Sequence, residues 1–395
     1  MKYHPLIFLI LLSLLACQEV FEAPEKVGKE GILVVEGIID SGTGSSTLKL
    51  SRTGSLSSRS TFKEEGASVS LLNASGETLI FSENAPGEYG INSPDLPSGS
   101  TYFLKIQTQN GQEYLSDSLT VFDTPEIDSV YWHREGDGVH IELATNNNLQ
   151  NSTENYLWKY TQTWEAFAEY RRYLEIEQSV SATGRRIYNV VYLQKDGKPY
   201  FDSSMYYCWQ QEFSRELLIN NTRQQQENRL RQPIAFVENT SPKFKTLWSI
   251  EVEQVSISRK AYDFFDLMKK NTELTGSIFD PQPAILYGNI HSVNIPDELV
   301  IGYAVLSPVK KKRIFIKRSE VTGWNPFIAC DPQQFSNSSD IIRDRVLNSF
   351  LPAYVPSDAA PFPQVPFFIA DLAPCVNCRI NGFNGKPDFW PQPTD

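Results

Sequence analysis

The chain has 395 residues and a formal net charge of −11 at pH 7. At roughly 100 to 200 residues per domain, this length predicts two or three domains, each large enough to bury a core of its own. A surface this acidic repels phosphate groups, so we expect no nucleic-acid partner.

The first residues have the pattern of an export signal. Lys2 precedes an apolar run from Pro5 to Ala16, which cannot cross a bilayer because a spanning helix needs ~20 residues. The run ends in Leu-Leu-Ala directly before Cys17, which resembles the bacterial lipobox. We therefore predict a lipoprotein signal peptide over 1–16 and lipidation of Cys17, whose acyl chains, such as palmitate, anchor the chain to a membrane. The alternative is an ordinary signal peptide with a chance cysteine.

A charged segment, residues 17–30, follows the predicted lipid site. It contains Pro24 and lacks a sustained apolar period, so it is predicted to be a tether. Glu19 and Glu22 lie close behind the cysteine, as in the surface-export signal of Bacteroidota lipoproteins. We expect the protein on the outer membrane, facing the cell exterior, and keep the periplasmic face as the alternative.

Residues 31–124 contain short β-rich runs separated by glycine, asparagine and proline turns. This spacing predicts an antiparallel, immunoglobulin-like β-sandwich, which ends where Pro125 removes a backbone donor. The fold class that we expect is therefore mainly β, with this sandwich followed by a larger β-rich domain and a few short helices. The predicted strands cover 32–39, 46–51, 67–73, 78–82, 101–108 and 114–121.

Residues 125–322 are predicted to form the larger β-rich domain with an aromatic-rich insertion. Runs at 127–133 and 139–144 flank a glycine-containing turn, as in a hairpin. Ser258 is a suitable N-cap for a short helix, since apolar residues follow at the i, i+3, i+4, i+7 spacing. Further strands are expected at 247–256, 299–306 and 313–317, with the basic cluster Lys310 to Arg313 at a solvated hairpin tip.

The aromatic-rich insertion begins with tyrosine and tryptophan at every second position from Tyr156 to Tyr160, and Trp164 continues that face. This period favours a strand, although residues 163–174 also fit the start of a helix. Exposed rings stack on sugars and nucleate peptide recognition, so a binding surface is reasonable, while ordinary sandwich core is the favoured alternative. The ligand-binding candidates are Trp158, Trp164, Tyr170 and Trp209.

Residues 323–395 form a proline-rich tail in which only 339–351 reads as helix. With Cys17 lipidated, an even number of cysteines remains, and disulfides are the default after export. Nearness in sequence favours one pair at the end of the tail and leaves the other two cysteines as the second pair, among three possible pairings. A redox pair and a four-cysteine zinc site are the alternatives. The favoured pairs are Cys375 with Cys378 and Cys208 with Cys330.

No catalytic motif stands out. The chain lacks a Gly-x-Ser-x-Gly elbow, a His-Glu-x-x-His zinc motif, a phosphate-binding loop and a calcium loop. His133 and His140 flank the predicted hairpin turn and make a plausible metal pair, but satisfied strand histidines are the favoured interpretation. We therefore predict no catalytic residues, no metal and no cofactor. Paired carboxylates for glycoside cleavage are a spatial condition that sequence spacing leaves open.

A series of short motifs runs along the mature chain, at residues 33–37, 125–130, 207–209, 278–281, 288–290, 302–303, 375–379 and 386–390. Their order resembles domain-of-unknown-function family 4249, lipoproteins of Bacteroidota, over nearly the whole mature chain. The resemblance implies a two-part β-lipoprotein, often encoded beside a TonB-dependent outer-membrane receptor, and hence a non-catalytic accessory subunit in nutrient capture. The alternatives are a surface hydrolase of glycans or peptides and a structural or adhesive envelope protein.

Overall fold

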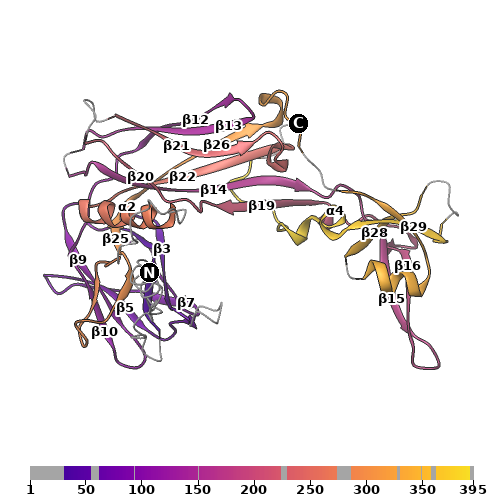
Figure 1. The fold of residues 1–395 in the computed structure, drawn as a ribbon, viewed down its shortest axis with the longest axis horizontal. Coiled ribbons are helices and arrows are strands. Elements are labelled where there is room, and N and C mark those ends of the chain that lie inside the picture. Colours follow the sequence, from indigo (N-terminus) through magenta and orange to yellow (C-terminus); the bar gives the residue numbers. More distant parts are fainter. Residues whose placement is uncertain are drawn as a thin grey trace, which may run out of the picture.

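The computed structural model is mainly β, as predicted, and its strands gather into three bodies (Figure 1). A first sandwich lies below a second one, and a smaller third body stands apart from the first at the other side of the view. No helix within the described ranges is long and apolar enough to cross a membrane. The structure describes residues 31–54, 62–92, 94–149, 151–223, 229–273, 286–326, 330–347, 349–356 and 362–391. The predicted signal peptide, Cys17, the tether and the motif at 278–281 lie outside these ranges.

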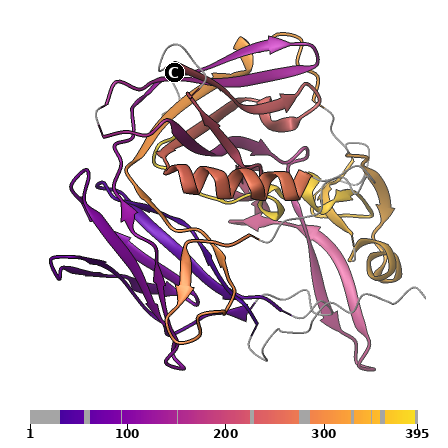
Figure 2. The ribbon, with the colours of Figure 1, turned by 60° about the vertical axis from the view of Figure 1, so that its left-hand side comes forward.

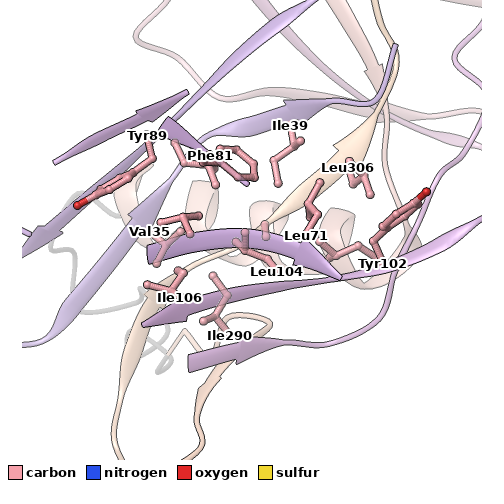
Figure 3. Close-up of a cluster of buried hydrophobic side chains, with 14 of the residues drawn as sticks. Val35, Ile39, Leu71, Phe81, Tyr89, Tyr102, Leu104, Ile106, Ile290 and Leu306 are labelled. Carbon is pink, nitrogen blue, oxygen red and sulfur yellow. The ribbon is translucent and has the colours of Figure 1, made fainter. Parts of the chain in front are cut away.

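The first sandwich consists of two six-stranded sheets. Apolar side chains alternate along its strands, so Leu48 and Leu50 are fully buried while Lys49 between them is exposed. Figure 3 shows how the two inner faces interdigitate around Leu71, Leu104 and Ile106. The strands of residues 31–124 are β1 (Leu33–Glu36), β2 (Ile38–Asp40), β3 (Ser45–Arg52), β4 (Phe62–Lys63), β5 (Ser68–Asn73), β6 (Thr78–Ile80), β7 (Ser82–Ala85), β8 (Glu88–Asn92), β9 (Thr101–Gln107), β10 (Glu113–Ser116) and β11 (Leu119–Thr120).

A distant segment completes this sandwich. Strand β23 (Ile290–Ser292) pairs with β10, and β24 (Val300–Gly302) runs parallel to β1. Next to them, β25 (Val305–Ser307) runs parallel to β2 (Ile38–Asp40). Ile290, Val300 and Leu306 accordingly belong to the core of the first sandwich. The predicted range 125–322 therefore includes a segment that folds with the sandwich predicted for 31–124. The sequence did not indicate this, because an apolar run does not reveal which strand it pairs with.

The second sandwich packs the sheet β12-β13-β21 against the sheet β19-β14-β22-β26, with β20 also pairing with β14. The predicted hairpin is confirmed, since β12 and β13 pair with His133 opposite His140. The aromatic segment is a strand, which the period-two pattern favoured over a helix. These strands are β12 (Ile127–Glu135), β13 (Gly138–Asn146), β14 (Asn155–Phe167), β19 (Tyr207–Phe213), β20 (Leu218–Asn221), β21 (Arg229–Glu238), β22 (Leu247–Ser256) and β26 (Val309–Lys317).

The basic cluster Lys310 to Arg313 is not a hairpin tip. It lies inside β26, where Lys311 and Arg313 pair in register with the acidic residues Glu253 and Glu251 of β22. The distance from Lys311 Nζ to Glu253 Oε1 is 2.6 Å, and that from Arg313 to Glu251 is 2.8 Å. Opposite charges directly across a sheet stabilise the pairing, so four cations in sequence are accommodated within one strand.

The predicted helix after Ser258 is confirmed as α2 (Arg259–Glu273). The hydroxyl of Ser258 accepts a hydrogen bond from the amide of Ala261 at 3.1 Å, as an N-cap does. Ala261 is buried and packs with Val255, Ile257 and Val305, so the helix covers the place where the two sandwiches meet. Figure 2 shows α2 lying across this junction.

The third body joins a hairpin from the middle of the chain to the C-terminal tail. Leu174 and Val190 of the hairpin share a small core with Phe335, Ile342 and Phe368 of the tail. The predicted helix at 339–351 is wrong beyond its first turns, because strand β28 begins at Phe350. The elements here are β15 (Leu174–Val180), β16 (Arg186–Tyr192), β17 (Gln194–Lys195), β18 (Lys198–Pro199), β27 (Gln333–Ser336), α3 (Ser339–Ile341), η5 (Ile342–Val346), β28 (Phe350–Tyr354), β29 (Phe367–Leu372), α4 (Ala373–Val376) and η6 (Cys378–Ile380).

Candidate functional site

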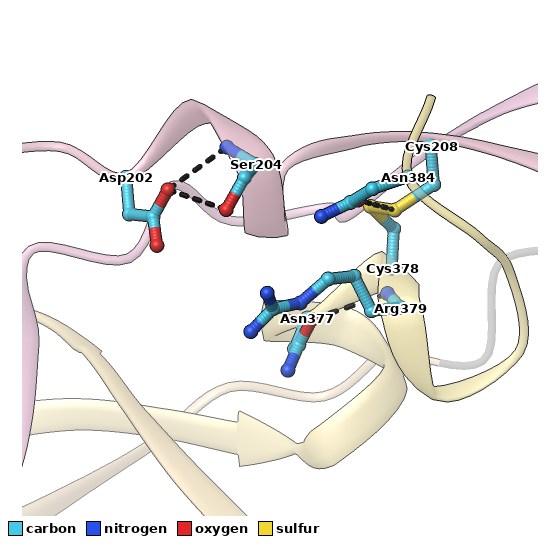
Figure 4. The surroundings of a disulfide bond; sticks show 7 residues. All are labelled: Asp202, Ser204, Cys208, Asn377, Cys378, Arg379 and Asn384. Atoms are coloured by element: carbon cyan, nitrogen blue, oxygen red, sulfur yellow. Dashed lines mark hydrogen bonds between the residues drawn. A yellow bond between two sulfur atoms is a disulfide. The ribbon is translucent and has the colours of Figure 1, made fainter. Parts of the chain in front are cut away.

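Two disulfides fasten the tail, and their pairing differs from the predicted one. Cys208 of β19 bonds to Cys378, and Cys330 bonds to Cys375. Cys375 lies in the short helix α4, and the backbone of Asn377 after it is extended. This change in the backbone points the side chains of Cys375 and Cys378 in different directions. Figure 4 shows Cys378 meeting Cys208 beside Asn384. Nearness in sequence therefore gave the wrong pairs, although all four cysteines do form disulfides.

The four aromatic candidates differ in what surrounds them. Trp158 is buried in the second sandwich, where its indole nitrogen donates to Gln254 at 2.9 Å. Trp164 and Trp209 are also buried, each with 7% of its surface exposed. Tyr170 is half-buried and its ring lies 6.1 Å from that of Tyr354. Three of the candidates are therefore mainly packing residues, as the core alternative expects.

Trp164 also lines a cleft of about 350 Å³ at the end of β14. Phe167 belongs to the same strand, and the disulfide from Cys330 to Cys375 lines the cleft together with Pro374. The second sandwich, the segment after β26 and the tail thus build this aromatic cleft jointly. A volume of this order is within the range of about 300–1,000 Å³ that is typical of small-molecule sites.

Charged groups at the aromatic cleft are already paired with protein. Lys245 Nζ lies 3.0 Å from Glu169 Oε2. Glu165 accepts hydrogen bonds from the hydroxyl of Tyr207 at 2.7 Å and from the indole of Trp390 at 3.0 Å. Burial, followed by the hydrogen bond to Glu165, raises the pKa of Tyr207 well above its usual value. With Lys245 paired to Glu169 and Glu165 held by two hydrogen bonds, the cleft is suited to a ligand that offers an apolar face, such as a sugar ring or a peptide side chain.

A second, larger cleft of about 500 Å³ lies between the two sandwiches. Glu36 and Lys49 of the first sandwich line it, and so do Lys159, Glu253 and Lys311 of the second. No sequence signal links these residues to one another, because Glu36, which lies in the motif at 33–37, and Lys159 stand far apart in the chain. Only the pairing of strands brings them together.

The two histidines of the β12–β13 hairpin face each other, with ring centroids 5.4 Å apart and planes nearly parallel. His133 also lies 3.8 Å from Glu142. Stacked rings of this kind are typical of a cross-strand pair. Among the described residues, three potential metal ligands gather at Cys330, Asp371 and Cys375. Their two sulfurs are bonded to each other and cannot act as thiolates.

These features define an all-β protein of two sandwiches with a disulfide-fastened third body and clefts at the junctions. The chain belongs to the family described as "Domain of unknown function (DUF4249)", whose model matches residues 18–313. The family inferred from the sequence motifs is thereby confirmed over these residues, and the motifs at 375–379 and 386–390 lie outside the match. No curated protein gives a significant match.

Several solved structures match part of the chain. A candidate carbohydrate-binding protein from Bacteroides uniformis is 13% identical, covers 59% of this chain and 92% of its own, and has a TM-score of 0.15. Alpha-2-macroglobulin from Escherichia coli is 10% identical over 60% of this chain and 15% of its own, at a TM-score of 0.17. The adhesin InvE of Yersinia pseudotuberculosis is 10% identical over 58% of each chain, at 0.15. At such TM-scores these likenesses carry no argument.

Proposed function

We propose that this chain is a non-catalytic lipoprotein on the outer face of a bacterial outer membrane, where it serves as an accessory subunit of a TonB-dependent transporter in nutrient capture. The aromatic cleft is the observation that carries the capture role. It combines Trp164 and Phe167 with charged groups that are already bound within the protein, and two disulfide-linked parts of the chain build it.

The predicted anchor supports the same proposal. A lipobox ending at Cys17 and a charged tether precede the folded bodies. Two acyl chains give stable membrane attachment, whereas one gives only reversible binding. Two disulfides fit an oxidising compartment outside the cytoplasm. A protein tethered in this way samples the membrane surface, where a barrel transporter is at high effective concentration.

The proposal is tested by purifying the native protein from membranes in mild detergent and identifying its companions and its N-terminus by mass spectrometry. We expect an acylated Cys17 and a co-purifying TonB-dependent barrel. The matched control is Cys17→Ser, which cannot be acylated and should lose the barrel because it leaves the membrane. An acylated protein that purifies alone would contradict the partnership. Turnover of pooled polysaccharides, abolished by a single carboxylate substitution, would contradict the non-catalytic role.

A further inference from the structure

The cleft between the sandwiches has two charged walls with opposite patterns. On the second sandwich, Lys159, Glu253 and Lys311 stand side by side on three neighbouring strands, because β22 pairs with both β14 and β26 in that register. On the first sandwich, Glu36 lies opposite Lys49 in the pairing of β1 with β3. The wall formed by the second sandwich thus carries a positive, a negative and a positive charge in turn. The wall formed by the first sandwich carries a negative charge beside a positive one.

Most of these charges are satisfied within the protein. Lys311 binds Glu253 at 2.6 Å, and Lys49 binds Glu88 of the next strand, β8, at 3.3 Å. Asp40, which also lines the cleft, accepts hydrogen bonds through Oδ1 from the amides of Gly42 at 2.9 Å and Val309 at 3.0 Å. These contacts leave one positive group on one wall and one negative group on the other.

The remaining groups are Lys159 and Glu36, whose side chains form no hydrogen bond or ion pair with any residue that the structure describes. Both residues are exposed and line the cleft, so the ammonium group of Lys159 and the carboxylate of Glu36 are open to a ligand. A ligand that carries both a carboxylate and an ammonium group would pair with both charges at once.

We propose that this cleft binds an amino-acid-like zwitterion, an amino acid or short peptide, with its carboxylate on Lys159 and its ammonium group on Glu36. The aliphatic residues Leu157, Val255 and Val309 line the same cleft, so an apolar side chain fits it best. The site is separate from the aromatic cleft. Its occupancy does not depend on lipidation or on a transporter partner.

The first test is calorimetric titration of the full-length protein with leucine and with the dipeptide Leu-Leu. Two blocked dipeptides, N-acetyl-Leu-Leu and Leu-Leu-amide, each lack one of the two charges. Because a charge-assisted hydrogen bond stabilises a complex enough to change Kd by ~tenfold or more, we expect each blocked form to bind at least that much more weakly. Failure of both zwitterions to bind, or equal binding of the blocked forms, would overturn the proposal.

The second test uses Lys159→Met and Glu36→Gln, which keep the length of each side chain and remove its charge. Each should weaken binding of Leu-Leu at least ~tenfold. Lys159→Met should also bind Leu-Leu and its amide equally, since the partner of the carboxylate is gone. The controls are Lys198→Met and Glu177→Gln, exposed residues outside the cleft, which should bind as the native chain does. Equal loss in the controls would contradict the assignment.

Discussion

At the scale of single residues, Tyr114 links the two segments that build the first sandwich. Its side chain is fully buried, and its hydroxyl donates a hydrogen bond to Glu298 at 2.7 Å. Burial and this hydrogen bond raise the pKa of Tyr114 to about 12, while the guanidinium of Arg52 opposes the shift. A raised pKa favours the protonated form in the folded state. The contribution to stability is therefore complete below pH ~10 and is lost as the pH rises from ~10 towards 12.

We expect Tyr114→Phe to reduce the free energy of unfolding by about 1–3 kcal/mol at neutral pH, because it leaves Glu298 without its donor. The variant should also lose less stability than the native chain between pH 10 and 12. Urea unfolding across this pH range measures both effects. The exposed Tyr200→Phe serves as control and should change neither quantity. An unchanged pH dependence in Tyr114→Phe would show that the hydroxyl plays no such role.

At the scale of elements, the close approach of three backbone segments explains the glycines in the family motifs. A Cβ on Gly302 would lie 2.0 Å from the carbonyl oxygen of Val35, and its φ of +121° is unfavourable for other residues. A Cβ on Gly288 would lie 1.7 Å from the carbonyl oxygen of Gly302. Asn289 then ties the segment down through hydrogen bonds of 2.8 and 2.9 Å to the backbone of Ala304.

Gly302→Ala should therefore lower the free energy of unfolding of the first sandwich by more than the strain of the positive φ alone would. Gly111 is the matched control, because its φ is +86° and a Cβ there meets nothing within 4 Å. Gly111→Ala should lower the free energy of unfolding by about 1–2 kcal/mol because of backbone strain. Gly302→Ala should lower it clearly more, since the added methyl group also separates β1 from β24. The measurement is the urea midpoint of unfolding of each variant, compared with that of the native chain. Equal destabilisation would mean that the backbone relaxes around the added methyl group.

The sequence predicted elements whose signals are local and failed where the partner is distant. The hairpin of β12 and β13 was predictable because a turn and two alternating runs adjoin, and α2 because its cap and apolar stripe do. The pairing of residues 290–307 with the first sandwich could not be predicted, since an apolar run fits many sheets. The sites follow the same division. Trp164 was found by its aromatic pattern, whereas no sequence signal links Lys159 to Glu36 until strand pairing places them on facing walls.

At the scale of the whole molecule, covalent and aromatic contacts fasten the third body to the second sandwich. Cys208 joins β19 to Cys378, and the backbones of Trp209 and Phe383 exchange hydrogen bonds of 3.0 and 2.8 Å beside it. Trp390 anchors the end of the described tail, with its ring 5.6 Å from that of Phe315 in β26. The first sandwich takes no part in these contacts and keeps a hydrophobic core of its own.

Removing the Cys208–Cys378 disulfide should consequently loosen the tail before it affects the first sandwich. The bond closes a separation of 170 residues, for which the chain-entropy model gives about 5 kcal/mol as an upper figure. In the variant with Cys208→Ser and Cys378→Ser, we expect limited proteolysis to cut within 323–391 at protease concentrations that leave the native chain intact. Mass spectrometry should still recover residues of the first sandwich in protected fragments. Reduction of the native protein opens both disulfides and should also lead to cleavage within the tail. Simultaneous cleavage of the tail and the first sandwich would instead show that the three bodies unfold as one cooperative unit.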